Sequence, residues 1–343
     1  MESNYTLDDF KAEVIRRENT KEDFVAPTLQ VSMLDDGETI RLNGSGEFLA
    51  QPNFHSQLAN HHGIPKRYYD AMQAIPGLRA ENVNAWLHHE PQDRMVRTLD
   101  GNARAYLSSK FRPLDNAFAL KAMSPVFEDF KDLEVKSHSL TDLRLYMQIV
   151  FPKLEADIGV GDPVQQGITI TNSEVGRGAL DVSSLIWRLQ CLNGMIGQSI
   201  LSRRHVGSRI DFNTDVNIYQ HDTIQAELES YKLRIRDVVR HALQESVFME
   251  TIEKLRSANE DEFSKRKARK TIENVTKKLE LTEDDIDGIF GNLAKEGNYS
   301  RYGLANAITF QAHDAEPDKA FDYEKMGNKI IELSDTEWRQ IVA

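Results

Sequence analysis

Apolar residues recur along the chain with two different periods, and the period changes near residue 219. Before that point, short runs alternate apolar and polar residues and are separated by turn-forming residues, as in half-buried strands. Beyond it, residues 221–256 place an apolar residue at every third or fourth position, which is typical of one long amphipathic helix. We therefore predict an α+β core domain over residues 1–218, mainly an antiparallel sheet with flanking helices. A helical C-terminal region with an acidic tail is predicted over 219–343.

Turn-forming residues divide this pattern into elements. Asp100-Gly101 lies between two strand-like runs and is the strongest hairpin signal in the chain, and Asp35-Asp36-Gly37 predicts a second hairpin. Strands are also expected at 133–140, at 143–151, where Pro152 ends the strand, and after Asp162-Pro163. The run SSLIWRLQCLNGMIG (183–197) fits a strand or a helix. Other helices are predicted near 1–26, 53–60, 66–75, 80–88, 116–127, 262–279, 282–294 and 300–313, followed by a partly irregular tail at 314–343.

Composition indicates the cellular compartment in which we expect the protein. The 343 residues carry a formal net charge of −12 and one cysteine, Cys191, so no internal disulfide is expected. The N-terminus is too charged for a signal peptide, and no run approaches the roughly 18 apolar residues of a membrane span. We expect a protein of the bacterial cytoplasm that does not enter a membrane.

Signatures of catalysis are missing from the sequence. It contains no GxSxG, P-loop or GxGxxG pattern and no HExxH spacing, and its two adjacent histidine pairs are poorly placed to chelate one metal ion. We therefore expect no cofactor and no metal, and we favour a non-enzymatic protein.

Arginine is concentrated in two segments of the predicted core, although the whole chain is acidic. In single-stranded nucleic-acid binding, cations follow the phosphates and aromatic rings stack on bases. The candidate phosphate-binding residues are Arg94, Arg97, Arg104, Lys110, Arg112, Arg177, Arg203, Arg204, His205 and Arg209, and the candidate stacking residues are Tyr106 and Phe111. The alternative is that these arginines form structural ion pairs with acidic helices of the C-terminal region or of a second subunit.

The stretch ITITNSEVGRGAL (168–180) combines a strand end with a glycine-assisted turn. Asn172 and Glu174 are candidate orienting residues, and Glu174 can accept two hydrogen bonds from one arginine. If this turn and the Asn193-Gly194 turn share one end of the sheet, Arg177 and the arginines after residue 202 converge there. A separate stretch, KRKARKTIENVTKK (265–278), is the most basic in the chain and either contacts phosphate or is a solvated face.

Several segments resemble, in order, a family of phage- and plasmid-encoded proteins. They are HSQLANHHGIPKRYYDAM (55–72), TLDGNARAYLSSKFRPLDN (98–116), VGDPVQQGITITNSEVGRGAL (160–180), RLQCLNGMI (188–196) and RRHVGSRI (203–210), with a weaker element at SRYGLANAIT (300–309). The family is usually labelled a phage/plasmid-like protein and is a domain of unknown function. The resemblance implies a gene of mobile elements, often near replication, recombination or anti-restriction functions, and it implies no reaction.

Three hypotheses follow. The first is a DNA-processing protein of a phage or plasmid that binds single-stranded DNA during recombination or replication, as an annealing or mediator protein does, and forms a homo-oligomer. The second is a counter-defence protein whose acidic surface captures a host defence or DNA-binding protein. The third is an undetected nuclease or nucleotide-modifying enzyme, which a turnover assay on DNA and nucleotides, repeated with Glu174→Gln, would test.

Overall fold

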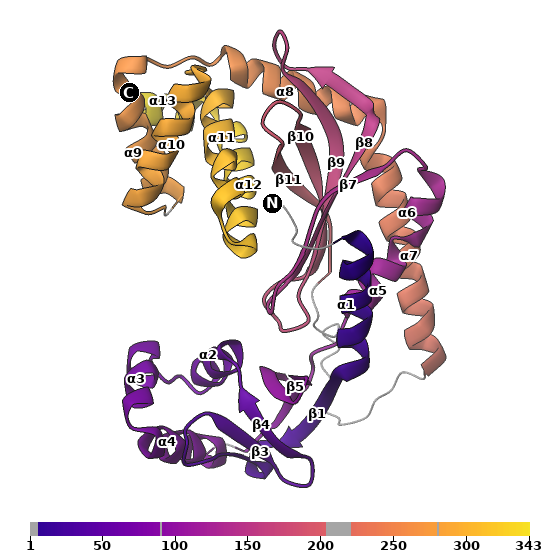
Figure 1. Ribbon diagram of the computed structural model, residues 1–343, viewed down its shortest axis with the longest axis vertical. Coiled ribbons are helices and arrows are strands. Elements are labelled where there is room, and N and C mark those ends of the chain that lie inside the picture. The colour runs from indigo at the N-terminus through magenta and orange to yellow at the C-terminus, as the bar shows by residue number, and fades with distance from the viewer. Residues whose placement is uncertain (1–5, 90, 204–220, 280) are drawn as a thin grey trace.

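The computed structural model describes residues 6–89, 91–203, 221–279 and 281–343. It has an α+β fold with two lobes, each built on its own sheet (Figure 1). The expected fold class is therefore confirmed. The expected boundary between residues 218 and 219 lies outside the described residues.

The N-terminal lobe consists of a six-stranded sheet and three helices. Its strands, in sheet order, are β1 (Lys21–Pro27), β5 (Asp93–Leu99), β6 (Asn102–Ser108), β4 (Gly46–Ala50), β3 (Thr39–Leu42) and β2 (Val31–Met33). Only β4 and β6 pair in parallel within this sheet. The helices are α2 (Pro52–His61), α3 (Lys66–Ala71) and α4 (Pro76–His89). Phe54 and Leu58 of α2 and Leu87 of α4 pack with Ile40 and Val96 of the sheet to form the core of this lobe.

The main lobe is built on a five-stranded antiparallel meander. In order along the chain and across the sheet, its strands are β7 (Glu134–Leu140), β8 (Leu145–Asp157), β9 (Pro163–Asn172), β10 (Leu180–Arg188) and β11 (Asn193–Arg203). Alternate side chains of β8 join different clusters, because successive residues of a strand point to opposite faces. Met147 and Ile149 pack on one face, and Tyr146 and Val150 pack on the other. Both faces of this sheet are therefore buried.

Helices cover the two faces of the meander (Figure 1). One face is covered by α1 (Leu7–Thr20), α5 (Asn116–Ala122), α6 (Ser124–Asp129) and α7 (His221–Ala242). On the other face, α12 (Pro317–Ile331) contributes Phe321. The remaining helices, α8 (Glu245–Glu260), α9 (Ala268–Leu279), α10 (Glu283–Glu296), α11 (Arg301–Thr309) and α13 (Asp335–Val342), share a core with α12. None of the helices in the described ranges has both the length and the apolar character needed to cross a membrane.

The turn chemistry predicted the hairpins correctly. Asp100 and Gly101 have φ values of 51° and 77°, which only a glycine or a short polar residue adopts readily, and they join β5 to β6. The Asp35-Asp36-Gly37 turn joins β2 to β3. The run 183–197, which fitted a strand or a helix, forms most of β10 and the start of β11.

Several sequence expectations were wrong. The helix predicted near 1–26 ends at Thr20, and Lys21–Pro27 form the strand β1. The predicted helix 221–256 is two helices, because the chain turns at Leu243-Gln244, and the Gln166 side chain donates to the freed carbonyl of Ala242. β8 continues past Pro152. The β8–β9 register shifts between Val150 and Glu155, so Pro152, which has no backbone N–H, does not have to donate a hydrogen bond to β9. The tail expected to be partly irregular forms α12 and α13, which bury Phe321 and Trp338.

Candidate functional site

Arg97 of β5, predicted to contact phosphate, is fully buried with 0% of its surface exposed. Its Nε and Nη2 donate to the two carboxylate oxygens of Asp23 at 2.7 and 3.0 Å, and Nη2 also donates to Asp115 Oδ1 at 2.9 Å. Its Nη1 donates to the backbone carbonyl of Glu174 at 2.7 Å. All three nitrogens of the guanidinium group are therefore used inside the protein.

The carboxylate of Asp115 is held between two cations. Burial alone would raise the pKa of Asp115, but the opposite charges of Arg97 and Lys21 outweigh it and lower this pKa below its usual value. Lys21 also binds Glu18 at 2.7 Å. The arrangement is a compensated ion-pair network. Its acids come from α1, from β1 and from the residue before α5, and not from the C-terminal helices that the alternative interpretation named.

Arg104 of β6 is also buried, and it contacts the turn between β9 and β10. Its Nη1 donates to Glu174 Oε2 at 2.8 Å, while the backbone N–H of Asn116 donates to Glu174 Oε1 at 2.7 Å. Asn172 donates through Nδ2 to the carbonyl of Leu114 at 2.7 Å and to Asn116 Oδ1 at 2.9 Å. Glu174 thus orients an arginine as predicted, but through one oxygen, and both of its carboxylate oxygens are occupied by structural contacts.

Tyr106 and Arg94 are packed against each other in the N-terminal lobe. Tyr106 is buried, and the Arg94 guanidinium lies 5.6 Å from the centre of its ring. Phe54 contacts Tyr106 edge-on at 5.6 Å between ring centres. Phe111 is half-buried, and the guanidinium of Arg97 lies 5.8 Å from its ring centre. The ring of Tyr106 therefore has no free face for a base.

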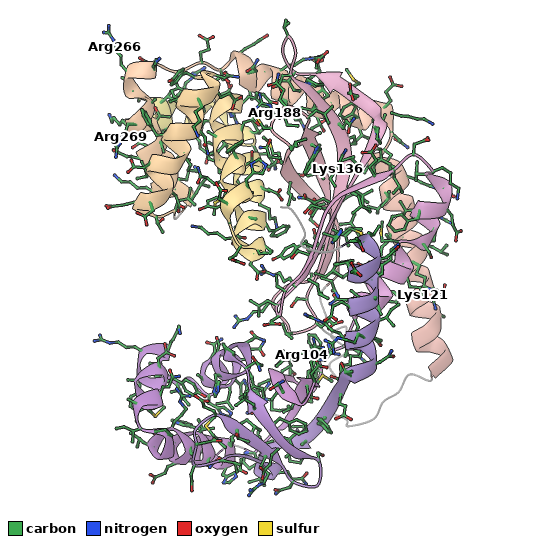
Figure 2. The ribbon with its side chains drawn as sticks, in the orientation of Figure 1. Arg104, Lys121, Lys136, Arg188, Arg266 and Arg269 are labelled. Atoms are coloured by element: carbon green, nitrogen blue, oxygen red, sulfur yellow. The ribbon has the colours of Figure 1, made fainter. Side chains whose placement is uncertain are left out.

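The turn of residues 173–179 joins the two lobes. Val175 packs in a small apolar cluster with Met95 and Leu107 of the N-terminal lobe. Arg177 is exposed, but its Nε donates to Asn53 Oδ1 at 2.5 Å and its Nη2 to Ser56 Oγ at 3.0 Å, both on α2. This stretch, singled out in the sequence, is therefore the junction through which the main lobe binds the N-terminal lobe. Figure 2 shows Arg104 at this junction.

The second turn singled out in the sequence lies elsewhere. Asn193-Gly194 follows the far end of β10, while the 173–179 turn precedes its start at Leu180, so the two turns occupy opposite ends of the strand. β11 returns along β10, and the backbone of Arg203 pairs with Leu180 near the junction. The side chain of Arg203 and the residues Arg204, His205 and Arg209 lie outside the described residues.

Of the predicted phosphate-binding residues in the described part, Lys110, Arg112 and Arg177 are exposed. Lys110 and Arg112 lie directly after β6, and Arg177 lies in the junction turn. Because Arg94, Arg97 and Arg104 are buried, the predicted arginine-rich surface does not form as one patch from the described residues.

The stretch 265–278 forms an exposed basic surface. It folds as a short 3₁₀ turn, Lys265–Lys267, followed by α9, whose Ala268, Ile272 and Val275 face the core. All seven cations of the stretch are exposed, and we call them the α9 basic surface: Lys265, Arg266, Lys267, Arg269, Lys270, Lys277 and Lys278. Arg266 and Arg269 point outward from the edge of the main lobe (Figure 2).

Acidic neighbours neutralise only part of the α9 basic surface. Arg269 pairs with Asp287 at 2.9 Å, and Lys278 pairs with Glu337 at 2.7 Å. Both pairs are well exposed, and such pairs contribute about 0–1 kcal/mol, so a phosphate can replace the carboxylate at little cost. Among the described residues, no acidic side chain lies within ion-pair distance of four of the cations: Lys265, Arg266, Lys270 and Lys277.

The acidic run 283–287, which could have compensated this surface, does so through Asp287 alone. Asp285 turns inward instead, and accepts hydrogen bonds from the backbone N–H of Thr282 at 2.8 Å and from Lys319 at 3.2 Å. Burial would raise the pKa of Asp285, but its hydrogen bonds, Tyr323 foremost, lower it to about 2. Asp285 therefore stabilises the start of α10 and neutralises none of the α9 cations.

The chain was compared with known proteins in three ways. No protein-family model matches it, and no curated protein and no solved structure matches it either. The resemblance to phage- and plasmid-encoded proteins therefore stays a prediction from the sequence.

Proposed function

We propose that the protein binds single-stranded DNA without catalysing a reaction on it, in recombination or replication of a phage or plasmid. The observation that supports this proposal most is the α9 basic surface, with seven exposed cations in fourteen residues. Phosphate neutralisation and counterion release supply most of the affinity of such surfaces. The binding residues differ from those expected, because the arginines of β5 and β6 have structural partners.

An aromatic ring at the edge of this surface favours single strands over duplex DNA. Tyr299 is half-buried, and the ammonium group of Lys265 lies 5.4 Å from its ring centre. A cation beside a ring places a phosphate contact next to a stacking face, which is the combination that single-strand binding uses. We propose that Tyr299 stacks on a base while the α9 cations follow the backbone.

The test is a fluorescence anisotropy titration of a labelled oligothymidine across a range of salt concentrations. The variant carries Arg266→Gln, Lys270→Gln and Lys277→Gln, which removes three cations that have no acidic partner among the described residues. We expect the log–log salt slope to decrease by about 2, because each phosphate of a single strand that is no longer neutralised lowers it by roughly 0.7. Affinity at low salt decreases in parallel.

A matched control removes three exposed lysines from the opposite side of the main lobe, namely Lys11→Gln, Lys121→Gln and Lys131→Gln. It changes the net charge by the same amount and should leave the slope unchanged. Equal weakening by both variants, or no binding by the unaltered protein at low salt, would overturn the proposal. A duplex of the same sequence tests the preference for single strands, and light scattering on each complex tests the expected homo-oligomer.

A further inference from the structure

A cavity of about 550 Å³ opens in the N-terminal lobe, remote from the α9 basic surface. Its lining residues come mainly from the end of β4 and from α2, α3 and α4. Its lining residues include Arg79, His55, Tyr69, Ser56, Asn60 and Gln73. Pockets of roughly 300–1,000 Å³ that combine apolar walls with a few convergent polar groups are the usual sites for small molecules.

Arg79 is a buried cation without an acidic partner. It belongs to α4, only 4% of its surface is exposed, and its Nη1 donates to the backbone carbonyl of Gly37 at 3.2 Å. Its Nε is buried without a hydrogen-bond partner, and within the described ranges no carboxylate lies within ion-pair distance of its guanidinium group. A buried charge of this kind is costly unless something compensates it.

The aromatic walls beside Arg79 are uncharged near neutral pH. His55 Nδ1 lies 2.7 Å from the Tyr69 hydroxyl, and the Arg79 guanidinium lies 5.2 Å from the centre of the Tyr69 ring. Burial and the charge of Arg79 lower the pKa of His55 to about 4, and burial raises the pKa of Tyr69 to about 12. Neither group therefore neutralises the guanidinium group.

The two acids that line the cavity are placed away from this charge. Asp70 is paired with Lys66 at 2.7 Å on the exposed side of α3, and Glu38 is exposed to solvent. The hydroxyl of Ser56 and the amides of Asn60 and Gln73 add neutral hydrogen-bonding groups. The cavity thus combines one uncompensated buried cation with polar groups that can hold an uncharged organic portion.

We propose that this cavity binds a small organic anion, whose phosphate or carboxylate group is held by Arg79. The guanidinium group presents its donors in a planar fork that matches both oxyanions. The inference is independent of DNA binding at the α9 basic surface, because the two sites share no residue.

The test is isothermal titration calorimetry of the full-length protein with four probes: inorganic phosphate, deoxythymidine monophosphate, succinate and uncharged thymidine. Binding of the first two but not succinate identifies a phosphate site, and binding of succinate identifies a carboxylate site. Thymidine should not bind. Arg79→Gln should weaken anion binding roughly ten- to a hundredfold, as expected when a charge-assisted hydrogen bond is removed.

A second pair of variants keeps the proposal testable if Arg79→Gln fails to fold. Asn60 is exposed on the cavity wall, so Asn60→Glu adds a repelling charge and leaves Arg79 in place, while Asn60→Gln is its uncharged control. We expect weaker anion binding for Asn60→Glu alone. The α9 triple variant should bind anions normally. No binding of any anion at millimolar concentration, equal binding of thymidine, or equal affinity of Asn60→Glu and Asn60→Gln would overturn the proposal.

Discussion

The lobe junction and the α9 basic surface contain the same kind of residue in opposite surroundings. At the junction, Arg97 and Arg104 are buried against carboxylates that lie far away in the sequence. On α9, seven cations are exposed, and several have no acid in contact. Local charge therefore does not identify a phosphate-binding surface. What separates the two regions is whether the fold brings carboxylates to the cations.

The largest expected effect is on stability, from the junction. Arg97→Met leaves the partly buried carboxylates of Asp23 and Asp115 without their shared cation. We expect the free energy of unfolding, measured by urea denaturation, to decrease by about 3–5 kcal/mol, because Asp23 loses its cation and Asp115 keeps only Lys21. DNA affinity of the folded fraction should be unchanged.

A variant that also removes the two carboxylate charges tests this explanation of the stability loss. When Arg97→Met is combined with Asp23→Asn and Asp115→Asn, the decrease should be smaller than for Arg97→Met alone, because no unpaired charge remains. A stable Arg97→Met protein with weakened DNA binding would reverse the comparison and make the junction the binding site.

A buried carboxylate that has no ion pair among the described residues provides the next test. Glu324 of α12 is 2% exposed, and it accepts a hydrogen bond from Gln148 Nε2 at 2.6 Å. Burial raises the pKa of Glu324 from 4.5 to about 7, and the hydrogen bonds from Gln148 and from the backbone N–H of Gly194 lower it only in part. The carbonyl oxygen of Gln148 is buried without a partner, so a protonated Glu324 can donate to it.

The sign of the resulting pH effect follows from these values. Between about pH 4.5 and pH 7 the folded protein retains the Glu324 proton while the unfolded chain releases it, so stability falls as pH rises through this window. Glu324→Gln should remove this decline and raise the free energy of unfolding at pH 8 by about 3 kcal/mol. Urea unfolding at pH 5 and pH 8 measures both. An unchanged pH slope in the variant would show that Glu324 is ionised in the fold.

The sequence predicted local features of the molecule better than distant pairings. The Asp100-Gly101 hairpin could be predicted because a two-residue turn is specified by its own residues. The partners of Arg97 could not be, because Asp23 lies 74 residues away and the spacing of residues in the sequence does not show which distant acid the fold brings to Arg97. The break at Leu243-Gln244 left no signal, since apolar spacing continues from α7 into α8 and the turn contains neither glycine nor proline.

The sequence contains one feature that could have predicted the proposed anion cavity, namely the position of Arg79 on its helix. Arg79 lies four and eight residues before Val83 and Leu87, so it shares the apolar face of α4, and both of those residues are fully buried. A cation on the buried face of a helix requires a partner or a ligand. The neighbouring wall could not be predicted, because β4 and α2–α3 meet α4 only through the tertiary fold.

The smallest expected effect is on stability, from the α9 basic surface. The triple variant Arg266→Gln, Lys270→Gln and Lys277→Gln removes exposed side chains that pair with no acid in the described part of the chain, so each change should alter the free energy of unfolding by no more than about 0.5 kcal/mol. The sign should be stabilising at low salt, because seven like charges in fourteen residues repel one another. Raising the ionic strength should remove the difference, because salt screens exposed charges. Thermal unfolding of both proteins at low and high salt measures this. A large destabilisation at either salt concentration would show that these cations, like Arg97, are structural, and the two regions would then no longer differ.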